Sequence, residues 1–264
     1  MYNLNGQAAV VTGAGSGLGQ AIARRLSLEG AAVVAADLNR RAAENLAAEL
    51  KGLGRRGLAL EADVTVKEDA ERMVKQCLEN FGQLDILVNN AGAGSLGLIV
   101  NQTEEEWERP MRVNLRGTFL CSQAAAKEMI PRKKGRIINI SSISGKSGEE
   151  FIGPYCASKF GVIGLTQALA KELARFSVNV NAVCPGYIWT PMWAEMAKWL
   201  KESVPALAGK TPQEIFERRV KSVTPLRRPQ TAEDIANLVA FLVSDQASNI
   251  TGQAINVDGG AVMH

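Results

Sequence analysis

Tyr155 and Lys159 are the two side chains whose types and spacing point most directly to chemistry. Lys159 follows Tyr155 by four positions, so a helix would place both on one face. An unperturbed phenol has a pKa of about 10, and a nearby cation favours the phenolate. Lys159 is therefore expected to bring the pKa of Tyr155 towards working pH, as an acid and base needs. The only histidine is His264, which argues against histidine-based triads and most zinc sites, so no metal is expected.

A glycine-rich turn follows the first apolar segment of the chain. Residues 12–19 read TGAGSGLG and open a helix predicted over residues 17–28. Where side chains are missing, backbone N–H groups and the helix N-terminus can approach a pyrophosphate. The residues expected to bind a dinucleotide here are Gly13, Ser16, Gly17, Leu18 and Gly19.

Asp37 ends the next apolar segment, about where a ribose-binding acid is expected. A carboxylate accepts hydrogen bonds from both ribose hydroxyls and repels a 2′-phosphate, and Leu38 adds no compensating charge. Asp37 therefore favours NAD(H) over NADP(H). Arg40 and Arg41 leave an alternative open, because either could reach back to a phosphate or lie solvated in the next helix.

The rest of the chain alternates short apolar runs with segments of helical period. This alternation predicts an α/β fold, a single doubly wound Rossmann domain over residues 1–264, with a parallel sheet covered by helices on both faces. The seven predicted strands are residues 8–12, 32–36, 57–61, 86–89, 136–140, 179–184 and 254–257. The predicted helices include residues 17–28, 41–50, 69–80 and 160–175.

Residues 191–223 depart from this alternation of short apolar runs and helical segments. Apolar residues recur there at helical spacing, and Thr211, Pro212 and Glu214 form a capping-box pattern that predicts a second helix. We expect a two-helix substrate lid over the active site. Asp63 and Val64, just after the third predicted strand, are expected to contact adenine, although an exposed loop acid is an alternative for Asp63.

Together these motifs closely resemble the short-chain dehydrogenase/reductase family, in its common single-domain subclass. The resemblance covers essentially the whole chain and is carried by residues 12–19, the Asn89-Asn90-Ala91-Gly92 run, Asn114, Ser142, Tyr155, Lys159 and Pro185-Gly186. It implies that Ser142, thirteen positions before Tyr155, hydrogen-bonds the substrate oxygen. It also implies that Tyr155 transfers the proton, that Lys159 binds the nicotinamide ribose and tunes Tyr155, and that Asn114 holds a water extending the proton relay.

Some of these implied roles have alternatives. On composition alone Ser141 and Ser144 also fit the serine role, and the spacing to the tyrosine selects Ser142. Asn114 is alternatively a polar residue that bends a helix and bonds to backbone. The resemblance implies further cofactor contacts from Asn90, Ala91, Gly92, Pro185, Gly186, Ile188 and Thr190. Of these, Ile188 and Thr190 would bind the nicotinamide carboxamide and fix the ring face that meets the substrate.

The lid and the loop before Tyr155 are where substrate specificity is expected. The residues predicted to contact substrate are Ser144, Glu149, Tyr187 and Trp193, a mixed lining that suits a compact polyhydroxylated molecule. Alternatively the tryptophans only anchor the lid helices. The ending at residues 251–260 and the long insertion resemble family members acting on sugar alcohols, polyol phosphates or vicinal diols.

Two other functions are considered. A 3-oxoacyl-carrier-protein reductase shares the implied catalytic motifs, but such enzymes mostly use NADPH and commonly carry a basic residue where this chain has Ser16. A non-catalytic NAD(H) sensor belongs to another class. The intact proton-transfer set argues against it.

The composition of the chain limits the binding partners and the cellular compartment that are expected for it. The net charge of the 264 residues is only +3, and the densest basic run, Arg132, Lys133, Lys134 and Arg136, is expected to be a solvated turn, so no nucleic acid is predicted. No apolar run is long enough for a membrane span. Four scattered cysteines without a C-x-x-C pair and the lack of a leader pattern favour the cytoplasm. The resemblance implies a homotetramer built through the helices with Asn114 and Tyr155 and the C-terminal strand.

Overall fold

A parallel sheet of seven strands forms the centre of the protein in the computed structural model, which describes residues 2–264. The strands are β1 (Ala8–Thr12), β2 (Ala32–Asp37), β3 (Gly57–Glu61), β4 (Ile86–Asn89), β5 (Gly135–Ile140), β6 (Val178–Pro185) and β7 (Ala254–Val257). Of these, β1, β3, β4 and β7 have the predicted bounds. The central strands are buried on both faces, which is why they read as continuous apolar runs.

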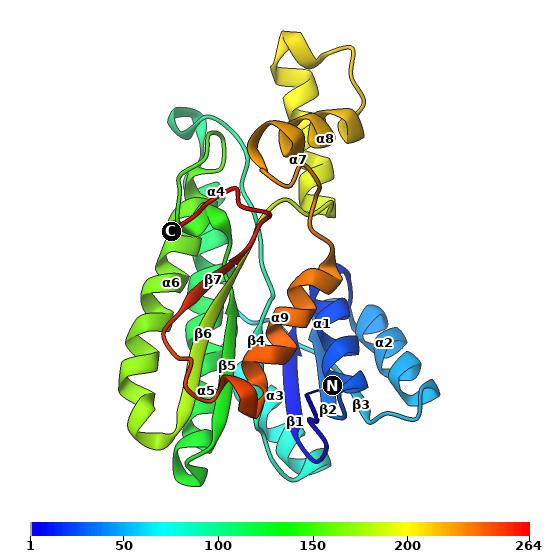
Figure 1. Cartoon of the computed structure of the whole chain (residues 1–264), viewed down its shortest axis with the longest axis vertical. Helices are drawn as coiled ribbons and strands as arrows, with labels where there is room; N and C mark the ends of the chain where they lie inside the picture. The colour runs from blue at the N-terminus through cyan, green and yellow to red at the C-terminus, as the bar shows by residue number, and fades with distance from the viewer. Residues whose placement is uncertain (1) are drawn as a thin grey trace.

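Helices cover both faces of the sheet (Figure 1). On one face lie α1 (Gly17–Leu28), α2 (Arg40–Gly52) and α9 (Ala232–Val243). On the other lie α3 (Lys67–Phe81), α5 (Gly117–Arg132) and α6 (Gly153–Leu173). Each contributes an apolar stripe to one of two large core clusters, so the predicted doubly wound α/β fold is confirmed.

The order of the strands in the sheet determines where a ligand-binding crevice forms. In the order β3-β2-β1-β4-β5-β6-β7, the chain moves outward in opposite directions from β1 and β4. The loops that follow these two strands therefore separate and leave a crevice at the carboxyl ends of the strands, where open α/β sheets bind their ligands.

Residues 191–223 form the helices α7 (Pro191–Ser203) and α8 (Pro212–Val223), which project above the carboxyl end of the sheet (Figure 1). Each begins with a threonine cap followed by proline. The Thr190 hydroxyl accepts a hydrogen bond from the Trp193 N–H, and Thr211 forms a reciprocal capping box with Glu214. The starts of both helices are thus fixed by local sequence.

The helix α6 differs from its prediction. It begins at Gly153 rather than at residue 160 and ends at Leu173, with a short 3-10 turn (Ala174–Phe176) after it. Pro154 lies in its first turn, where a missing N–H costs no hydrogen bond. The prediction started too late because the Gly-Pro pair looks like a loop, and the helix is not clearly amphipathic. The earlier start places Tyr155 in the first turn.

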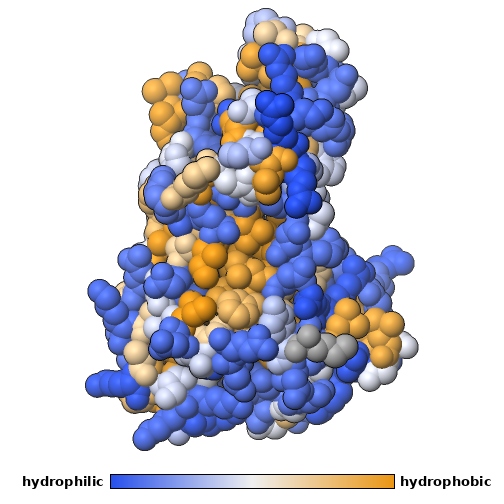
Figure 2. Space-filling model, in the orientation of Figure 1, coloured by the Kyte–Doolittle hydropathy of each residue, from blue (hydrophilic) through white to orange (hydrophobic). Residues whose placement is uncertain are grey.

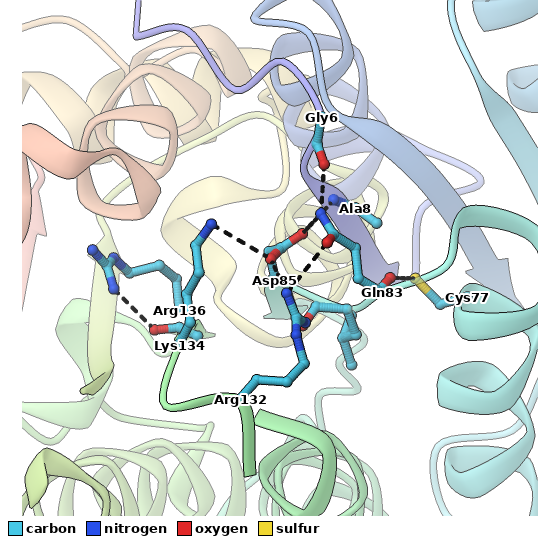
Figure 3. A network of polar contacts seen from close by, with 10 residues as sticks. Gly6, Ala8, Cys77, Gln83, Asp85, Arg132, Lys134 and Arg136 are labelled. Carbon is cyan, nitrogen blue, oxygen red and sulfur yellow. Dashed lines mark hydrogen bonds and ion pairs between the residues drawn. The ribbon is translucent and has the colours of Figure 1, made fainter. Parts of the chain in front are cut away.

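The basic run lies at the opposite, amino-terminal edge of the sheet. It is a solvated turn as predicted, with Arg132, Lys133 and Lys134 exposed, but it also holds a buried carboxylate that the sequence did not indicate (Figure 3). Arg132 donates to Asp85 Oδ1 at 2.8 Å, and Lys134 Nζ lies 3.9 Å from the same atom. Arg136 lies 3.7 Å from Asp245, while the exposed Lys133 takes a left-handed conformation at the end of α5. Among the helices in residues 2–264, none combines the length and apolar character needed to span a bilayer.

Candidate active site

A cavity of about 840 Å³ lies across the carboxyl ends of the strands. Of the site residues predicted from sequence, all but Asn114 line it. The lining members are Gly13, Ser16, Gly17, Leu18, Gly19, Asp37, Asp63, Val64, Asn90, Ala91, Gly92, Ser142, Ser144, Glu149, Tyr155, Lys159, Pro185, Gly186, Tyr187, Ile188, Thr190 and Trp193. Segments far apart in sequence therefore meet in one space, with a glycine-rich end and a lid end.

The glycine-rich end has three glycines that are needed for different reasons. Gly13 has a φ of +63°, and a Cβ there would lie 2.9 Å from the Ala91 Cα. A Cβ on Gly19 would overlap the Gly13 carbonyl oxygen. Gly17 has a φ of +53° and open space where its side chain would be. The first two permit close packing of the turn, and the third leaves the cavity clear.

The start of α1 fits a dinucleotide diphosphate. Ser16 is the N-cap of this helix, yet its side chain makes no capping hydrogen bond, and the first turn holds no acidic residue. The first N–H groups of α1 thus remain available to a ligand, and the positive end of the helix dipole favours an anion there. Gly17 beside them would not obstruct a phosphate.

Asp37 lies at the end of β2, beside the glycine turn. Its Oδ2 accepts a hydrogen bond from the Gly15 N–H and its Oδ1 one from the Asn39 N–H, both at 2.8 Å. Each oxygen keeps a further lone pair for a ribose hydroxyl. Arg40 and Arg41 are the two arginines that left the choice between NAD(H) and NADP(H) open. Arg40 pairs with Glu44 at 2.8 Å, and neither arginine lines the cavity.

The asparagines after β4 divide into two roles. Asn89 is buried below the cavity and donates to Ser122 Oγ and Asn139 Oδ1, so it is structural. Asn90 lines the cavity and donates to the Thr12 carbonyl at 2.9 Å, which joins the β4 loop to the glycine turn. Nearby, Asp63 Oδ1 accepts from the Thr65 N–H and orders the loop after β3.

Tyr155 and Lys159 lie one turn apart on α6, as their spacing predicts. The Lys159 Nζ is 5.6 Å from the centre of the Tyr155 ring and donates to the Ile140 carbonyl at 2.8 Å. Burial raises the pKa of Tyr155 to about 12 and lowers the pKa of Lys159 to about 8. The largest cause of the raised pKa of Tyr155 is desolvation, and the lowering expected from Lys159 is not among its causes.

Ser142 lies beside the phenol and opposes that increase, since its hydroxyl lowers the pKa of Tyr155 through a hydrogen bond. It precedes the 3-10 turn Ile143–Gly145, and its Oγ accepts from the Ser144 N–H at 3.1 Å. Ser141 instead donates to the Lys159 carbonyl at 2.9 Å, which commits its hydroxyl to the fold. The geometry therefore agrees with the choice of Ser142 by spacing.

Asn114 lies behind the cavity wall, in a π-helical turn (Met111–Arg116) between α4 (Glu104–Pro110) and α5. Its amide accepts from the Ala93 N–H at 2.8 Å and donates to the Ala93 carbonyl and Ser158 Oγ, both at 2.9 Å. These bonds use both N–H groups of the amide, in line with the alternative of a helix-bending residue bonded to backbone, and leave one lone pair of Oδ1 for the expected water. It fixes the loop that places Gly92 near Lys159 Nζ.

The lid end is aromatic. Trp193 packs against Tyr187 with ring centres 5.5 Å apart and against Phe216 of α8 at 5.3 Å. Tyr187 donates its hydroxyl to Glu149 Oε1 at 3.0 Å. Burial raises the pKa of Tyr187 to about 12, so it remains a donor at neutral pH. Trp193 both lines the cavity and anchors the lid, and its contact with substrate stays a prediction.

Ser95 is a cavity residue that the sequence analysis missed. It follows the Asn89–Gly92 motif by three positions, and its loop passes under α7, where a Cβ on Gly94 would lie 3.2 Å from Met192 Sδ. Within residues 2–264 its buried Oγ has no hydrogen-bond partner. Its place directly after a motif loop was the one available signal.

A glycine-rich turn at a helix N-terminus and a phenol–ammonium pair share one cavity, and this arrangement is typical of oxidoreductases that use a nicotinamide cofactor. The comparisons with known proteins agree. The model of the family described as short chain dehydrogenase matches residues 7–201, and the chain belongs to this family. Within residues 2–264 no cluster of metal-ligating side chains is found.

Several relatives align with nearly the whole chain. A short-chain dehydrogenase/reductase of Armillaria gallica is 41% identical over 97% of this chain and 96% of its own. A 3-oxoacyl-[acyl-carrier-protein] reductase of Thermotoga maritima is 37% identical, covering 98% and 99%. A diacetyl reductase, (S)-acetoin forming, of Staphylococcus epidermidis is 40% identical, covering 96% and 98%.

The fold of a solved structure agrees as well. The crystal structure of a short-chain alcohol dehydrogenase of Sinorhizobium meliloti superposes with a TM-score of 0.87 at 35% identity, covering 98% of both chains. The fold is thus shared over the whole length, lid included.

Proposed function

We propose that this protein is an NAD(H)-dependent oxidoreductase that transfers a hydride between nicotinamide and a secondary alcohol or ketone. One observation carries the proposal: Tyr155, Lys159 and Ser142 line the same cavity as the glycine turn and Asp37. A proton carrier and a dinucleotide cleft in one space are what this reaction requires.

In the proposed reaction, Tyr155 takes the hydroxyl proton during oxidation and returns it during reduction. Ser142 donates a hydrogen bond to the substrate oxygen and holds it beside the phenol. The Lys159 ammonium stabilises the phenolate across the 5.6 Å to the ring. Bound nicotinamide supplies the hydride donor or acceptor and, when oxidised, a further positive charge. Asn114 acts indirectly, through the loop that it fixes.

The preference for NAD(H) over NADP(H) rests on Asp37. Its carboxylate lines the cavity without a cationic partner, since the nearby Arg40 is bound to Glu44. We expect Asp37→Ala to lower the ratio of kcat/KM for NAD over NADP about tenfold, because a repulsive charge and two ribose contacts are lost. Kinetics with both cofactors measure this. Wild-type protein that already prefers NADP would refute the assignment.

For the substrate we propose a polyol or vicinal diol, and within this pair the vicinal diol or its hydroxyketone. The lid end carries an aromatic cluster, and Glu149, the carboxylate predicted to contact substrate, already accepts a hydrogen bond from Tyr187. The diacetyl reductase relative acts on a small vicinal carbonyl compound, as its name states. A panel of 2,3-butanediol, acetoin, sorbitol and secondary mono-alcohols with NAD at pH 9 tests this. Faster turnover of sorbitol than of butanediol would reverse the choice.

A second candidate is a 3-oxoacyl-carrier-protein reductase, favoured by the Thermotoga maritima relative. Ser16 at the glycine turn and the acid at Asp37 argue against the NADPH that most such enzymes use. Efficient reduction of acetoacetyl thioesters with NADPH would favour this candidate.

We also propose that the protein works as a homotetramer in the cytoplasm. Phe119 on α5 and Phe160 on α6 are 43% and 46% exposed, which is unusual for phenylalanine on a surface helix. Figure 2 shows a second apolar area in the middle of the face on which β7 and α9 lie. Molar mass from light scattering tests the tetramer.

A further inference from the structure

We propose that Glu149 and Arg219 form an ion pair that acts as a charge filter at the lid end of the cavity, so that the enzyme prefers uncharged carbonyl substrates over anionic ones of the same size. The inference rests on the proposed function and deepens it by naming a substrate property and the residues that set it.

The pair joins the two sides of the substrate space. Glu149 belongs to the loop between β5 and α6, and Arg219 lies on α8, the second lid helix. The Arg219 guanidinium is 3.6 Å from Glu149 Oε2 and 5.9 Å from the centre of the Tyr187 ring. Tyr187 completes the group by donating to the other carboxylate oxygen at 3.0 Å.

The position of the pair gives it an influence on substrate charge. Glu149 and Tyr187 line the cavity, whereas Arg219 lies directly behind them and is not part of the lining. The Glu149 side chain is 21% exposed and that of Arg219 47%, so the carboxylate is the more enclosed of the two charges. An incoming anion thus meets the negative member first, and the positive charge behind it is already neutralised.

The Tyr187 phenol and the Arg219 guanidinium compete with substrate hydroxyls for the Glu149 carboxylate, which the sequence predicts as a substrate contact. Both of its oxygens are engaged, one with a phenol and one with a guanidinium. A neutral substrate experiences an ion pair of no net charge. A substrate carboxylate at this end would instead lie near Glu149, because the Arg219 cation is held behind the lining by Glu149; the cations that do line the cavity are Lys159 and Arg109.

A cycle of four proteins tests the filter: wild type, Glu149→Gln, Arg219→Gln and the double variant. The substrates are diacetyl and pyruvate, which have the same number of heavy atoms and differ by one negative charge. The measured quantity is the ratio of kcat/KM for pyruvate over diacetyl, with NADH. Any difference in intrinsic reactivity between the two ketones cancels when this ratio is compared across the four proteins.

We expect the ratio to increase about tenfold in Glu149→Gln and to decrease about tenfold in Arg219→Gln. One unit charge about 6 Å from the substrate, at an effective dielectric constant of about 40, has an effect of this size. The double variant should return to the wild-type ratio, and so should Arg219→Lys, which retains the charge. Arg218→Gln is the matched control, because this exposed neighbour does not line the cavity and should leave the ratio unchanged.

Shifts of opposite sign distinguish a charge filter from a purely structural contact. Loss of a structural contact would lower kcat/KM for both ketones in both single variants. Ratios within twofold of wild type in both single variants, or shifts of the same sign, would overturn the filter while leaving the proposed function intact. Wild-type protein that reduces neither ketone with NADH would overturn both. If Arg219→Gln fails to fold, Glu149→Gln with Arg219→Lys as its partner still decides the sign.

Discussion

The protein buries an ionisable side chain at each end of the parallel strands, the amino-terminal edge and the carboxyl-terminal edge of the sheet, and the two side chains differ in how their charge is paired. At the amino-terminal edge, the Asp85 carboxylate accepts from the Ala8 N–H at 2.9 Å and from Gln83 and Arg132 at 2.8 Å (Figure 3). At the carboxyl-terminal edge, Lys159 has one hydrogen bond, to a carbonyl, and burial lowers its pKa to about 8. The Asp85 carboxylate thus has a partner of opposite charge, whereas within residues 2–264 the Lys159 ammonium does not.

This difference indicates what each edge does. A buried carboxylate that is bonded on both oxygens holds together β1, β4 and the end of α5, and leaves no lone pair facing a cavity. A buried ammonium without a carboxylate partner lowers the stability of the free protein but is ready to stabilise a phenolate. Burial of charge therefore serves the fold at one edge and chemistry at the other.

The largest expected effect is on turnover at the carboxyl-terminal edge. Tyr155→Phe removes the proton carrier and should lower kcat about 1,000-fold, as expected for loss of a general acid and base. Steady-state kinetics measure this, while NADH fluorescence titration should show unchanged cofactor affinity and a thermal melt an unchanged Tm. Near wild-type turnover in this variant would remove Tyr155 from the mechanism.

The next effect is on stability, at the amino-terminal edge. Asp85→Ala should lower the free energy of unfolding by about 3 kcal/mol, because it leaves the Ala8 N–H and Arg132 without their partner. Urea denaturation measures the loss, and the activity per folded molecule should remain within twofold of wild type. Asp245→Ala is the control, since that side chain is 94% exposed and should change stability little. A catalytic defect in folded Asp85→Ala would break the comparison.

The smallest effect has the opposite sign. Lys159→Met should raise the free energy of unfolding at pH 7 by about 2 kcal/mol, because a buried ammonium is removed and only one hydrogen bond is lost. The folded pKa of about 8 lies below the ordinary lysine value of 10.5, so wild type gains stability as pH rises between these values. The difference in urea melts should therefore be largest below pH 8 and shrink towards pH 10. Lys134→Met, at the other edge, should show no gain.

Features determined by local sequence could be predicted well. The bounds of β1, β4 and α1 follow from apolar periodicity and from the glycine turn between strand and helix. The cofactor end was found because each of its residues belongs to a short motif at a fixed distance from a strand end. Tyr155 and Lys159 were found for the same reason, since four positions on a helix fix their relation.

Features that depend on pairing between distant residues could not be predicted. Asp85 and Arg132 are 47 positions apart, and nothing in either neighbourhood indicates the other. The same is true of Glu149 and Arg219, so the prediction that Glu149 contacts substrate did not include its lid arginine. The raised pKa of Tyr155 could not be predicted either, because it depends on how far the folded chain excludes water from the phenol and not on the distance to Lys159 alone.

The two threonine-proline starts of the lid have a consequence for how this family can diversify. Thr190 and Thr211 each cap the start of a lid helix through contacts within a few residues. The starts of both lid helices are therefore specified by the lid's own sequence. Phe216 and Val220 of α8 join the lid to the rest of the protein by packing with Tyr187 and Ile143, and Trp193 and Trp199 of α7 pack on Tyr187 and Phe151. A lid of another length or composition that keeps these few apolar contacts is therefore transplantable, so specificity can evolve as an exchangeable module on an unchanged sheet.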